Sequence, residues 1–411
     1  MPVNKINLKL ESLRGFAALF VVIGHVFYYH KYFDKSFFPA FPDVIFDSTN
    51  TAHISVLIFF ILSGYVIGAS NKINLTWATT LAYLKKRTLR LYPIYFVCIL
   101  FALIIATHSY PIKTILSNFT FTQAAFTEVI WENNPIWSLN YEVLYYLLFI
   151  PISVYNINPI IVFFSSIAIA LTGNHLCPDI PIIPSYFYGF SFWVIGLCIA
   201  KYSNNQKQEV SSTKLVAVIF FIMALDRLLA NSGVVISVDN ILDKFTVMVH
   251  DKYWATIIIP IRDLVLLPYC SCIVMLFAGN NFRYQKLMML ILQIPVLFAI
   301  IHFLSHFSLN YYLLVSIAYY MNAVVLYVIP VSFFDQLCLP IIKTGTWLGA
   351  ISYGIYVVHF PILVSIGRLD IFLVHKVPAY MLKFLLYLLL VVFCSFVLEK
   401  KYQPFIKKVI G

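Results

Sequence analysis

Residues 11–25 read ESLRGFAALFVVIGH, and this stretch decides the fold class of the chain. It opens an apolar run over about 13–32, and a helix needs roughly 20 mostly apolar residues to cross a membrane. Eleven helical steps make three turns and a small remainder, so Arg14 and His25 share one face, about 16 Å apart along the axis. We expect Arg14 at the cytoplasmic interface, within reach of Glu11, and His25 near the midplane. An ionisable residue at that depth marks a functional site, unless His25 is only a packing histidine.

The rest of the chain repeats this apolar character. It has 411 residues, of which 61% are hydrophobic and 11% charged, whereas a soluble domain carries about 25% charged residues. Twelve apolar runs lie near 13–32, 54–70, 92–109, 140–154, 157–173, 186–201, 214–230, 255–279, 287–304, 311–331, 346–366 and 380–398. The sequence therefore predicts an all-α polytopic membrane bundle of 10–12 transmembrane helices.

The net charge of +11 reflects topology and does not indicate nucleic acid, because the basic residues lie in short loops between apolar runs. The richer set of loops contains Lys5, Lys9, Lys85, Lys86, Arg87, Arg90, Lys201, Lys207, Lys214, Arg283, Lys286, Lys343, Lys400, Lys401, Lys407 and Lys408. The alternate set contains Arg227, Lys244 and Lys252. The richer set is predicted to be cytoplasmic, which puts both termini inside.

The apolar runs extend almost from end to end, so we expect residues 1–411 to form a single integral membrane domain with no appended soluble domain. Seven cysteines are scattered without a CxxC pair, which indicates neither a disulfide framework nor a zinc site. No metal is predicted. The first run lacks a small-residue cleavage site and is expected to be a retained helix.

A second constellation is KKRTLRLYP, residues 85–93. Arg87 and Arg90 are three residues apart, so both would face one way on a helical turn. Arginine forks bind phosphate in bidentate fashion. Spacing alone favours a simpler interpretation, in which these residues anchor the topology.

A third constellation is WSLNYEVLYYLL, residues 137–148, where a helix would start at the outer face. Ser138 is a plausible N-cap, and Glu142 follows one turn later, where the helix dipole favours a carboxylate. Glu142 would serve as an acid, a base or an acceptor for a sugar hydroxyl. A purely structural capping role is equally compatible with the pattern.

A fourth constellation is GAISYGIYVVHFP, residues 349–361. Ser352, Tyr356 and His359 recur at i, i+4 and i+7, which makes one polar stripe on an apolar helix. Taken alone, the stripe is explained slightly better by hydrogen bonding between spans.

These elements occur together and in order, and the chain thereby resembles the acyltransferase-3 family of integral membrane O-acyltransferases, such as surface-polysaccharide and lipopolysaccharide O-acetylases. The motifs are ESLRGFAALFVVIGH, FFILSGYVIG at 59–68, RTLRLYP at 87–93, WSLNYE at 137–142 and SYGIYVVH at 352–359. The usual Asp-Gly before Leu-Arg is Glu11-Ser12 here. The family core has ten spans, so the extra pair of runs is expected between 214 and 331.

The resemblance implies transfer of an acyl group, most often acetyl, from cytoplasmic acyl-coenzyme A to a hydroxyl of a cell-surface glycan or its lipid-linked precursor. His25 and Arg14 match the family's essential pair. Arg87 and Arg90 match the motif for coenzyme A recognition, and Glu142 matches its acidic position. The implied setting is the plasma membrane, as the inner membrane of a bacterium, with lipid as a further partner. No oligomeric state follows.

The expected mechanism has the phosphates of acyl-coenzyme A held by Arg87, Arg90 and Arg14. His25 then acts as a general base or carries the acyl group. Glu142 would lie on the other side, near the acceptor. Further candidates for contacting the acceptor or orienting groups are Trp137, Ser352, Tyr353, Tyr356 and His359.

Two other classes compete with an acyltransferase. A secondary transporter would use Arg262, Asp263 and His25 as a proton relay. The sequence shows no matched pair of interrupted helices in two halves, which counts against it. A non-catalytic scaffold of a surface-polymer assembly complex is the third possibility, and the intact Arg14 and His25 count against that.

Overall fold

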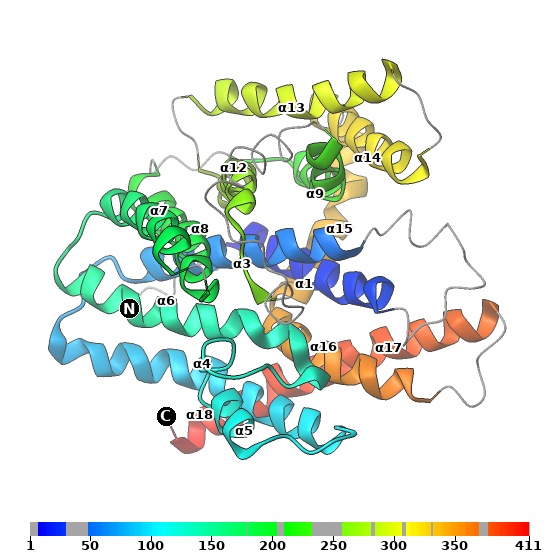
Figure 1. The fold of residues 1–411 in the computed structure, drawn as a ribbon. Helices are drawn as coiled ribbons and strands as arrows, with labels where there is room; N and C mark the ends of the chain where they lie inside the picture. The colour runs from blue at the N-terminus through cyan, green and yellow to red at the C-terminus, as the bar shows by residue number, and fades with distance from the viewer. Residues whose placement is uncertain are drawn as a thin grey trace.

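The computed structural model describes residues 7–29, 48–177, 179–203, 209–231, 257–280, 284–305, 310–329, 332–369 and 377–410. The described residues are helical and contain no strand, which confirms the all-α prediction (Figure 1). The helices are α1 (Leu8–Tyr28), α3 (Ser48–Ser70), α4 (Trp77–Ile104), α5 (Ile112–Phe119), η1 (Trp131–Ile136), α6 (Trp137–Val154), α7 (Pro159–Leu176), α8 (Ile182–Tyr202), α9 (Ser212–Asn231), η2 (Ile261–Leu266), α12 (Leu267–Ala278), α13 (Gln285–Ser305), α14 (Tyr311–Val328), α15 (Ser332–Gly349), α16 (Ser352–Gly367), α17 (Val377–Val397), η4 (Leu398–Tyr402) and α18 (Gln403–Ile410).

Within the described ranges, nine helices are long and apolar enough to cross a membrane, and the pair α15–α16 brings the number to ten. The runs near 140–154 and 214–230 also form helices, α6 and α9, but neither passes as a span. Helix α6 carries Asn140 and Glu142, and α9 carries Lys214, Asp226 and Arg227. The polytopic helical bundle is therefore confirmed, with nine or ten candidate spans in the described ranges.

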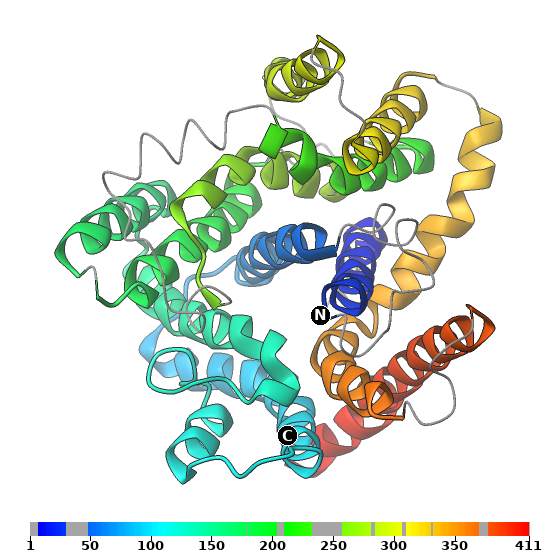
Figure 2. The same ribbon diagram turned by 45° about the vertical axis from the view of Figure 1, so that its right-hand side comes forward.

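Helices α1 and α3 lie at the middle of the bundle, and the other helices surround them (Figure 2). Glycines allow this close packing. A Cβ on Gly64 of α3 would come within 1.9 Å of the carbonyl oxygen of Trp193 on α8, and one on Gly196 within 2.1 Å of that of Ile61. Small residues that let backbones approach are the usual device for joining helices in lipid.

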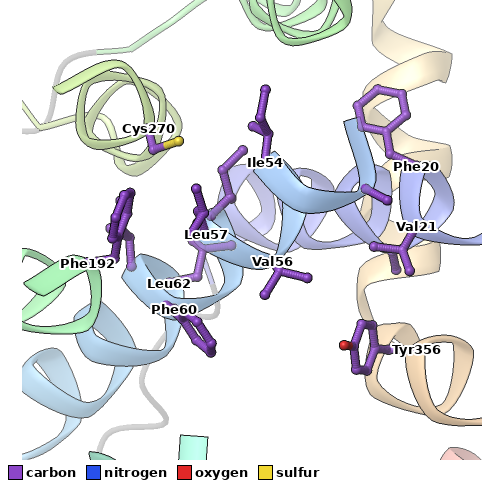
Figure 3. Packing of buried hydrophobic residues seen from close by; sticks show 14 of the residues in the cluster. Phe20, Val21, Ile54, Val56, Leu57, Phe60, Leu62, Phe192, Cys270 and Tyr356 are labelled. Atoms are coloured by element: carbon purple, nitrogen blue, oxygen red, sulfur yellow. The ribbon is translucent and has the colours of Figure 1, made fainter. Parts of the chain in front are cut away.

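Large apolar side chains fill the space around these two helices (Figure 3). Val21 of α1 and Leu57 of α3 are fully buried, and Phe192 of α8 packs on the side of α3 that faces away from Val21. In contrast, α13 at the edge of the bundle exposes most of its apolar side chains (Figure 1). Such a helix suits contact with lipid tails, because they are as apolar as its side chains.

Several helix boundaries differ from those predicted. Helix α4 begins at Trp77 rather than near residue 92, so Arg87 and Arg90 lie inside it and not in a loop. The predicted continuous run 346–366 is broken, since α15 ends at Gly349 and α16 starts at Ser352 with a bend of 75°. The predicted loop residues Lys5, Lys207, Lys244, Lys252 and Arg283 lie outside the described residues.

Candidate active site

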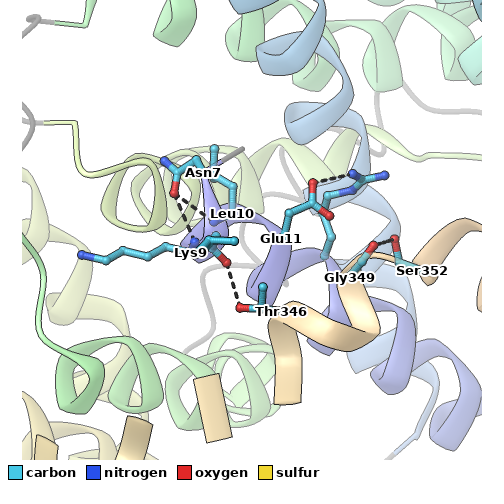
Figure 4. A network of polar contacts seen from close by, with 9 residues as sticks. Asn7, Lys9, Leu10, Glu11, Thr346, Gly349 and Ser352 are labelled. Carbon is cyan, nitrogen blue, oxygen red and sulfur yellow. Dashed lines mark hydrogen bonds and ion pairs between the residues drawn. The ribbon is translucent and has the colours of Figure 1, made fainter. Parts of the chain in front are cut away.

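The first turn of α1 fixes the position of Arg14. Asn7 caps the helix, because its Oδ1 accepts from the backbone N–H groups of Lys9 at 3.1 Å and Leu10 at 3.4 Å. Arg14 follows two turns later and pairs with Glu11, Nη1 to Oε1, at 2.9 Å. This ion pair confirms the pairing predicted from their spacing, and Figure 4 shows Glu11 beside the cap.

His25 lies in the last turn of α1, since the helix runs from Leu8 to Tyr28. The predicted run 13–32 would have put it near the middle of the helix. The actual bounds put it about 25 Å from the first residue of a helix about 30 Å long. His25 therefore lies near the end of α1, whereas Arg14 lies about 9 Å from its first residue.

Helix α15 packs against the start of α1 with almost no space between the backbones. A Cβ on Gly349 would come within 1.9 Å of the carbonyl oxygen of Glu11. The hydroxyl of Thr346 donates to the carbonyl of Leu8 at 3.0 Å in the same contact (Figure 4). Helix α16 follows α15 directly along the chain. Its first residue, Ser352, therefore lines the same pocket as Arg14.

A polar pocket opens where α1, α3, α4, α6 and α16 meet. The empty volume of the pocket, including the solvent at its open side, is about 720 Å³. Its polar lining comprises Arg14, Ser63, Arg87, Arg90, Ser138, Glu142, Tyr146, Ser352, Tyr353 and Tyr356. Residues from all five motifs thus contribute to one pocket, and three of them are arginines.

Arg87 is the most deeply placed of these arginines, with only 6% of the residue exposed. Its guanidinium lies 5.4 Å from the ring centre of Tyr83 and 5.7 Å from that of Tyr146. Its Nε–H group is buried and has no hydrogen-bond acceptor among the described residues. A buried N–H without an acceptor is costly, and a bound anion is one kind of group that would supply the acceptor.

Glu142 was expected on the other side from the arginines, near the acceptor, but it lines the same pocket as the three arginines. Its Oε1 accepts from the Ser63 hydroxyl at 2.9 Å and from the Tyr146 hydroxyl. The hydroxyl of Ser63 also accepts from the indole N–H of Trp193 at 3.2 Å. The carboxylate is therefore held firmly from two helices.

The predicted N-cap at Ser138 is wrong. The short helix η1 runs directly into α6, so the residue before α6 is Ile136, already in a helical conformation. The Ser138 hydroxyl instead bonds to that of Tyr356 at 2.6 Å, and Tyr356 donates to the carbonyl of Pro135 at 2.5 Å. Ser138 thus joins α6 to α16 rather than starting a helix.

His25 bonds to a second histidine that comes from α16. Nδ1 of His25 lies 2.9 Å from Nε2 of His359, with ring centres 5.1 Å apart and ring planes at 18°. His359 is fully buried, and its Nδ1 lies 2.7 Å from the backbone carbonyl of Tyr356. Tyr356 thereby belongs to both places: its side chain lines the pocket and its backbone holds the histidine pair.

The remaining predicted site residues have separate places. Tyr353 lines the pocket and donates to the carbonyl of Leu91 at 2.7 Å, and Ser352 donates to that of Gly349 at 2.8 Å. Trp137 is buried against Tyr141 at 5.2 Å between ring centres and does not line the pocket.

Sequence reasoning gave no role to two residues of the pocket, Ser63 and Tyr146. Both residues have a feature in the sequence that could have identified them. Ser63 is the only hydroxyl within the motif FFILSGYVIG other than a tyrosine, and Tyr146 follows Glu142 by four residues on one helix. That spacing puts the two side chains on one face, where the tyrosine reaches the carboxylate.

Other chemistry has little support in the described part of the chain. No group of three His, Cys, Asp or Glu side chains is arranged there to hold a metal ion, and all seven cysteines are free. Asp263 pairs with His53, Oδ2 to Nε2, at 2.6 Å. No hydrogen bond described here joins this pair to His25, as a proton relay would need.

Comparison with known proteins gives one match. The family model described as an acyltransferase domain, Acyl_transf_3, matches residues 7–285. The chain matches no curated protein and no solved structure. The matched region contains Arg14, His25, both α4 arginines and Glu142, whereas His359 lies beyond its end.

Proposed function

The chain belongs to the acyltransferase-3 family, and we propose that it transfers an acetyl group from acetyl-coenzyme A to a hydroxyl of a glycan. The family identifies the chain as an acyltransferase, and its many long apolar helices identify it as a multi-pass membrane protein. The donor, the acceptor and the membrane belong to the proposal. The acceptor is a cell-surface glycan or its lipid-linked precursor, and the membrane is the plasma membrane, as the inner membrane of a bacterium.

The buried Nε of Arg87 is the observation that carries the donor assignment. Coenzyme A bears a diphosphate and a further phosphate, and guanidinium groups bind phosphates with paired, charge-assisted hydrogen bonds. Arg14 and Arg90 line the same pocket, so three cationic groups face one anion.

Glu142 lies among these arginines and has a balancing role in this proposal. A carboxylate held by Ser63 and Tyr146 offsets part of the positive charge while the donor is absent. We therefore assign Glu142 to the donor pocket and not to the acceptor.

The histidine pair supplies the chemistry. A thioester is already activated, so placing it beside a hydroxyl and a base is sufficient for transfer. The acceptor oxygen attacks the acyl carbon, the C–S bond breaks, and the proton of the hydroxyl passes through His25 to the departing thiolate. Transfer through an acyl-imidazole on His25 gives the same products in two steps.

The donor assignment is tested by binding. The protein in lipid nanodiscs is titrated with acetyl-coenzyme A by calorimetry. Arg87→Ala removes hydrogen bonds to a charged group and is expected to weaken binding by about 10- to 100-fold. Lys86→Ala, next in sequence and exposed, is the matched control and should bind normally. Equal affinity for both variants would contradict the assignment.

The acceptor is tested by mass spectrometry of surface glycans from cells with and without the protein. The expected result is a mass difference of one acetyl group on a sugar residue. Glycans identical in mass would exclude a cell-surface glycan as the acceptor. Consumption of acetyl-coenzyme A by membranes separates this enzyme from a carrier, which would move a solute without consuming it.

A further inference from the structure

The contacts of His359 decide which of its nitrogens carries a proton. Its Nδ1 lies 2.7 Å from the carbonyl oxygen of Tyr356, and a carbonyl only accepts. Nδ1 of His359 must therefore be the N–H. A neutral imidazole carries one proton, so Nε2 of His359 keeps its lone pair and accepts a hydrogen bond.

The same reasoning then applies to His25. Its Nδ1 lies 2.9 Å from Nε2 of His359. Since that nitrogen accepts, Nδ1 of His25 must donate, and the lone pair of His25 is left on its Nε2. The hydrogen bonds of the described residues give this Nε2 no side-chain partner, so it is available to a substrate.

The pair is neutral at rest because of its surroundings. His359 is 0% exposed, and no carboxylate of the described residues hydrogen-bonds to either ring. A buried imidazolium without a carboxylate is strongly disfavoured. Two neutral rings with one proton each satisfy every contact, whereas an additional proton would have to be placed on Nε2 of His25.

The rings are also fixed in orientation. The stacked arrangement with His359 is completed by Phe360, whose ring meets that of His25 edge-on at 5.8 Å. Turning the His25 ring over would replace Nδ1 by a carbon and break the bond to His359. The tautomer and the orientation of His25 thus depend on its hydrogen bond to His359 of α16, beside a contact with the backbone of Val21 in its own helix.

We propose that His359 is a positioning residue that locks His25 in the Nδ1–H tautomer and so makes its Nε2 the base for acyl transfer. The inference rests on the proposed function. In the reaction Nε2 takes the proton of the acceptor hydroxyl, the oxygen bonds to the acyl carbon and the C–S bond breaks. The thiolate then receives that proton from Nε2, which restores the resting pair.

A neutral partner has a physical advantage over the carboxylate of a catalytic triad. It fixes the tautomer as the aspartate does, but it brings no additional charge into an apolar bundle. His359 itself cannot act as the base, because its two nitrogens are occupied by Tyr356 and His25. This division of roles gives the two histidines different responses to substitution.

The first test reads the tautomer directly. Solid-state NMR of the protein labelled with ¹⁵N-histidine distinguishes protonated from unprotonated ring nitrogens, and subtracting the spectrum of His25→Asn identifies the signals of His25. The expected signals are a protonated Nδ1 and an unprotonated Nε2. The opposite tautomer would overturn the inference, even if acyl transfer itself were demonstrated. Absence of transfer from acetyl-coenzyme A would instead contradict the proposed function, whatever the spectrum shows.

The second test compares two substitutions of His359. In His359→Gln the amide can donate to the Tyr356 carbonyl and accept from His25, so kcat should stay within about tenfold of the original. His359→Leu leaves the tautomer free and should lower kcat by about 10³-fold or more, with the KM for acetyl-coenzyme A unchanged. A His359→Leu enzyme with the original kcat would overturn the inference. So would equal losses in both variants, because these would indicate packing alone.

Discussion

Gly15 on α1 and Gly345 on α15 are in direct backbone contact: a Cβ on Gly15 would lie 2.0 Å from the carbonyl oxygen of Gly345. The same Cβ would lie 2.7 Å from the backbone nitrogen of Gly349, one helical turn further along α15. Real Cβ atoms do not approach backbone so closely. This contact sets the distance between Arg14 and the start of α16, and it therefore sets the width of the arginine pocket.

Gly15→Val is accordingly expected to push α1 and α15 apart. The variant should lose thermal stability in detergent and acyl transfer together, since both depend on the same contact. Overpacking of this kind costs about 1–3 kcal/mol or more. Gly173→Ala on α7 is the control, because its Cβ would meet Pro184 at an ordinary 3.7 Å. A fully active Gly15→Val protein would show that the contact does not define the pocket.

His25→Ala should abolish glycan acylation while the protein still accumulates in membranes. Loss of a general base lowers rates by about 10²- to 10⁴-fold. Acetyl-coenzyme A binding should persist, because His25 does not line the pocket of the three arginines. His175→Ala on α7 removes an exposed histidine and should change neither quantity. Retained acylation in His25→Ala would exclude it as the catalytic residue.

Tyr356→Phe removes one hydroxyl and leaves two buried groups, the Ser138 hydroxyl and the Pro135 carbonyl, without their partner. We expect a loss of about 1–3 kcal/mol in the free energy of unfolding, measured by reversible denaturation in detergent. Tyr202→Phe is the matched control, since its hydroxyl bonds to Asn158 at the exposed surface. Equal effects of the two substitutions would mean that burial does not govern this hydrogen bond.

Glu132 is a buried carboxylate outside the arginine pocket, and only 1% of it is exposed. It accepts from the Tyr110 hydroxyl at 2.7 Å and pairs with Arg368 at 3.7 Å. Burial, together with the hydrogen bond to Glu132, raises the pKa of Tyr110, so that hydroxyl stays a donor at neutral pH. Glu132→Gln should lower the unfolding free energy by about 1.5–3 kcal/mol.

Glu128→Gln is the matched control for Glu132→Gln, because Glu128 is a carboxylate close in sequence whose side chain is exposed. Thermal unfolding of the two variants measures the difference. If Glu132→Gln were as stable as Glu128→Gln, the link from η1 to the end of α16 would be dispensable.

The features that were predicted correctly from the sequence are those that depend on a single helix. Arg14 and His25 do lie on one helix, and the Glu11 pair is present, because helical periodicity follows from the sequence alone. The stripe of Ser352, Tyr356 and His359 also stays on one helix, α16. These features need no knowledge of neighbouring helices.

The features that were not predicted from the sequence depend on how the helices pack against one another. The position of Glu142 beside the arginines of α1 and α4 was not predicted, because it depends on how α6 packs against those helices. The N-cap at Ser138 failed because η1 continues into α6 and leaves no free helix start. The partnership of His25 with His359 joins residues 334 positions apart, which no local pattern contains.

The bend between α15 and α16 has an electrostatic consequence. A straight helix would turn its side toward the arginine pocket, where its peptide groups are already paired with each other. The 75° bend instead presents the beginning of α16 there, through Ser352 and Tyr353. The beginning of a helix carries about half a unit of positive charge, from N–H groups not yet used within the helix. One of them, on Gly354, is taken by Glu399 at 3.1 Å. The break in the helix thus brings the positive end of a helix dipole to the pocket, and the Glu399 carboxylate offsets part of that charge.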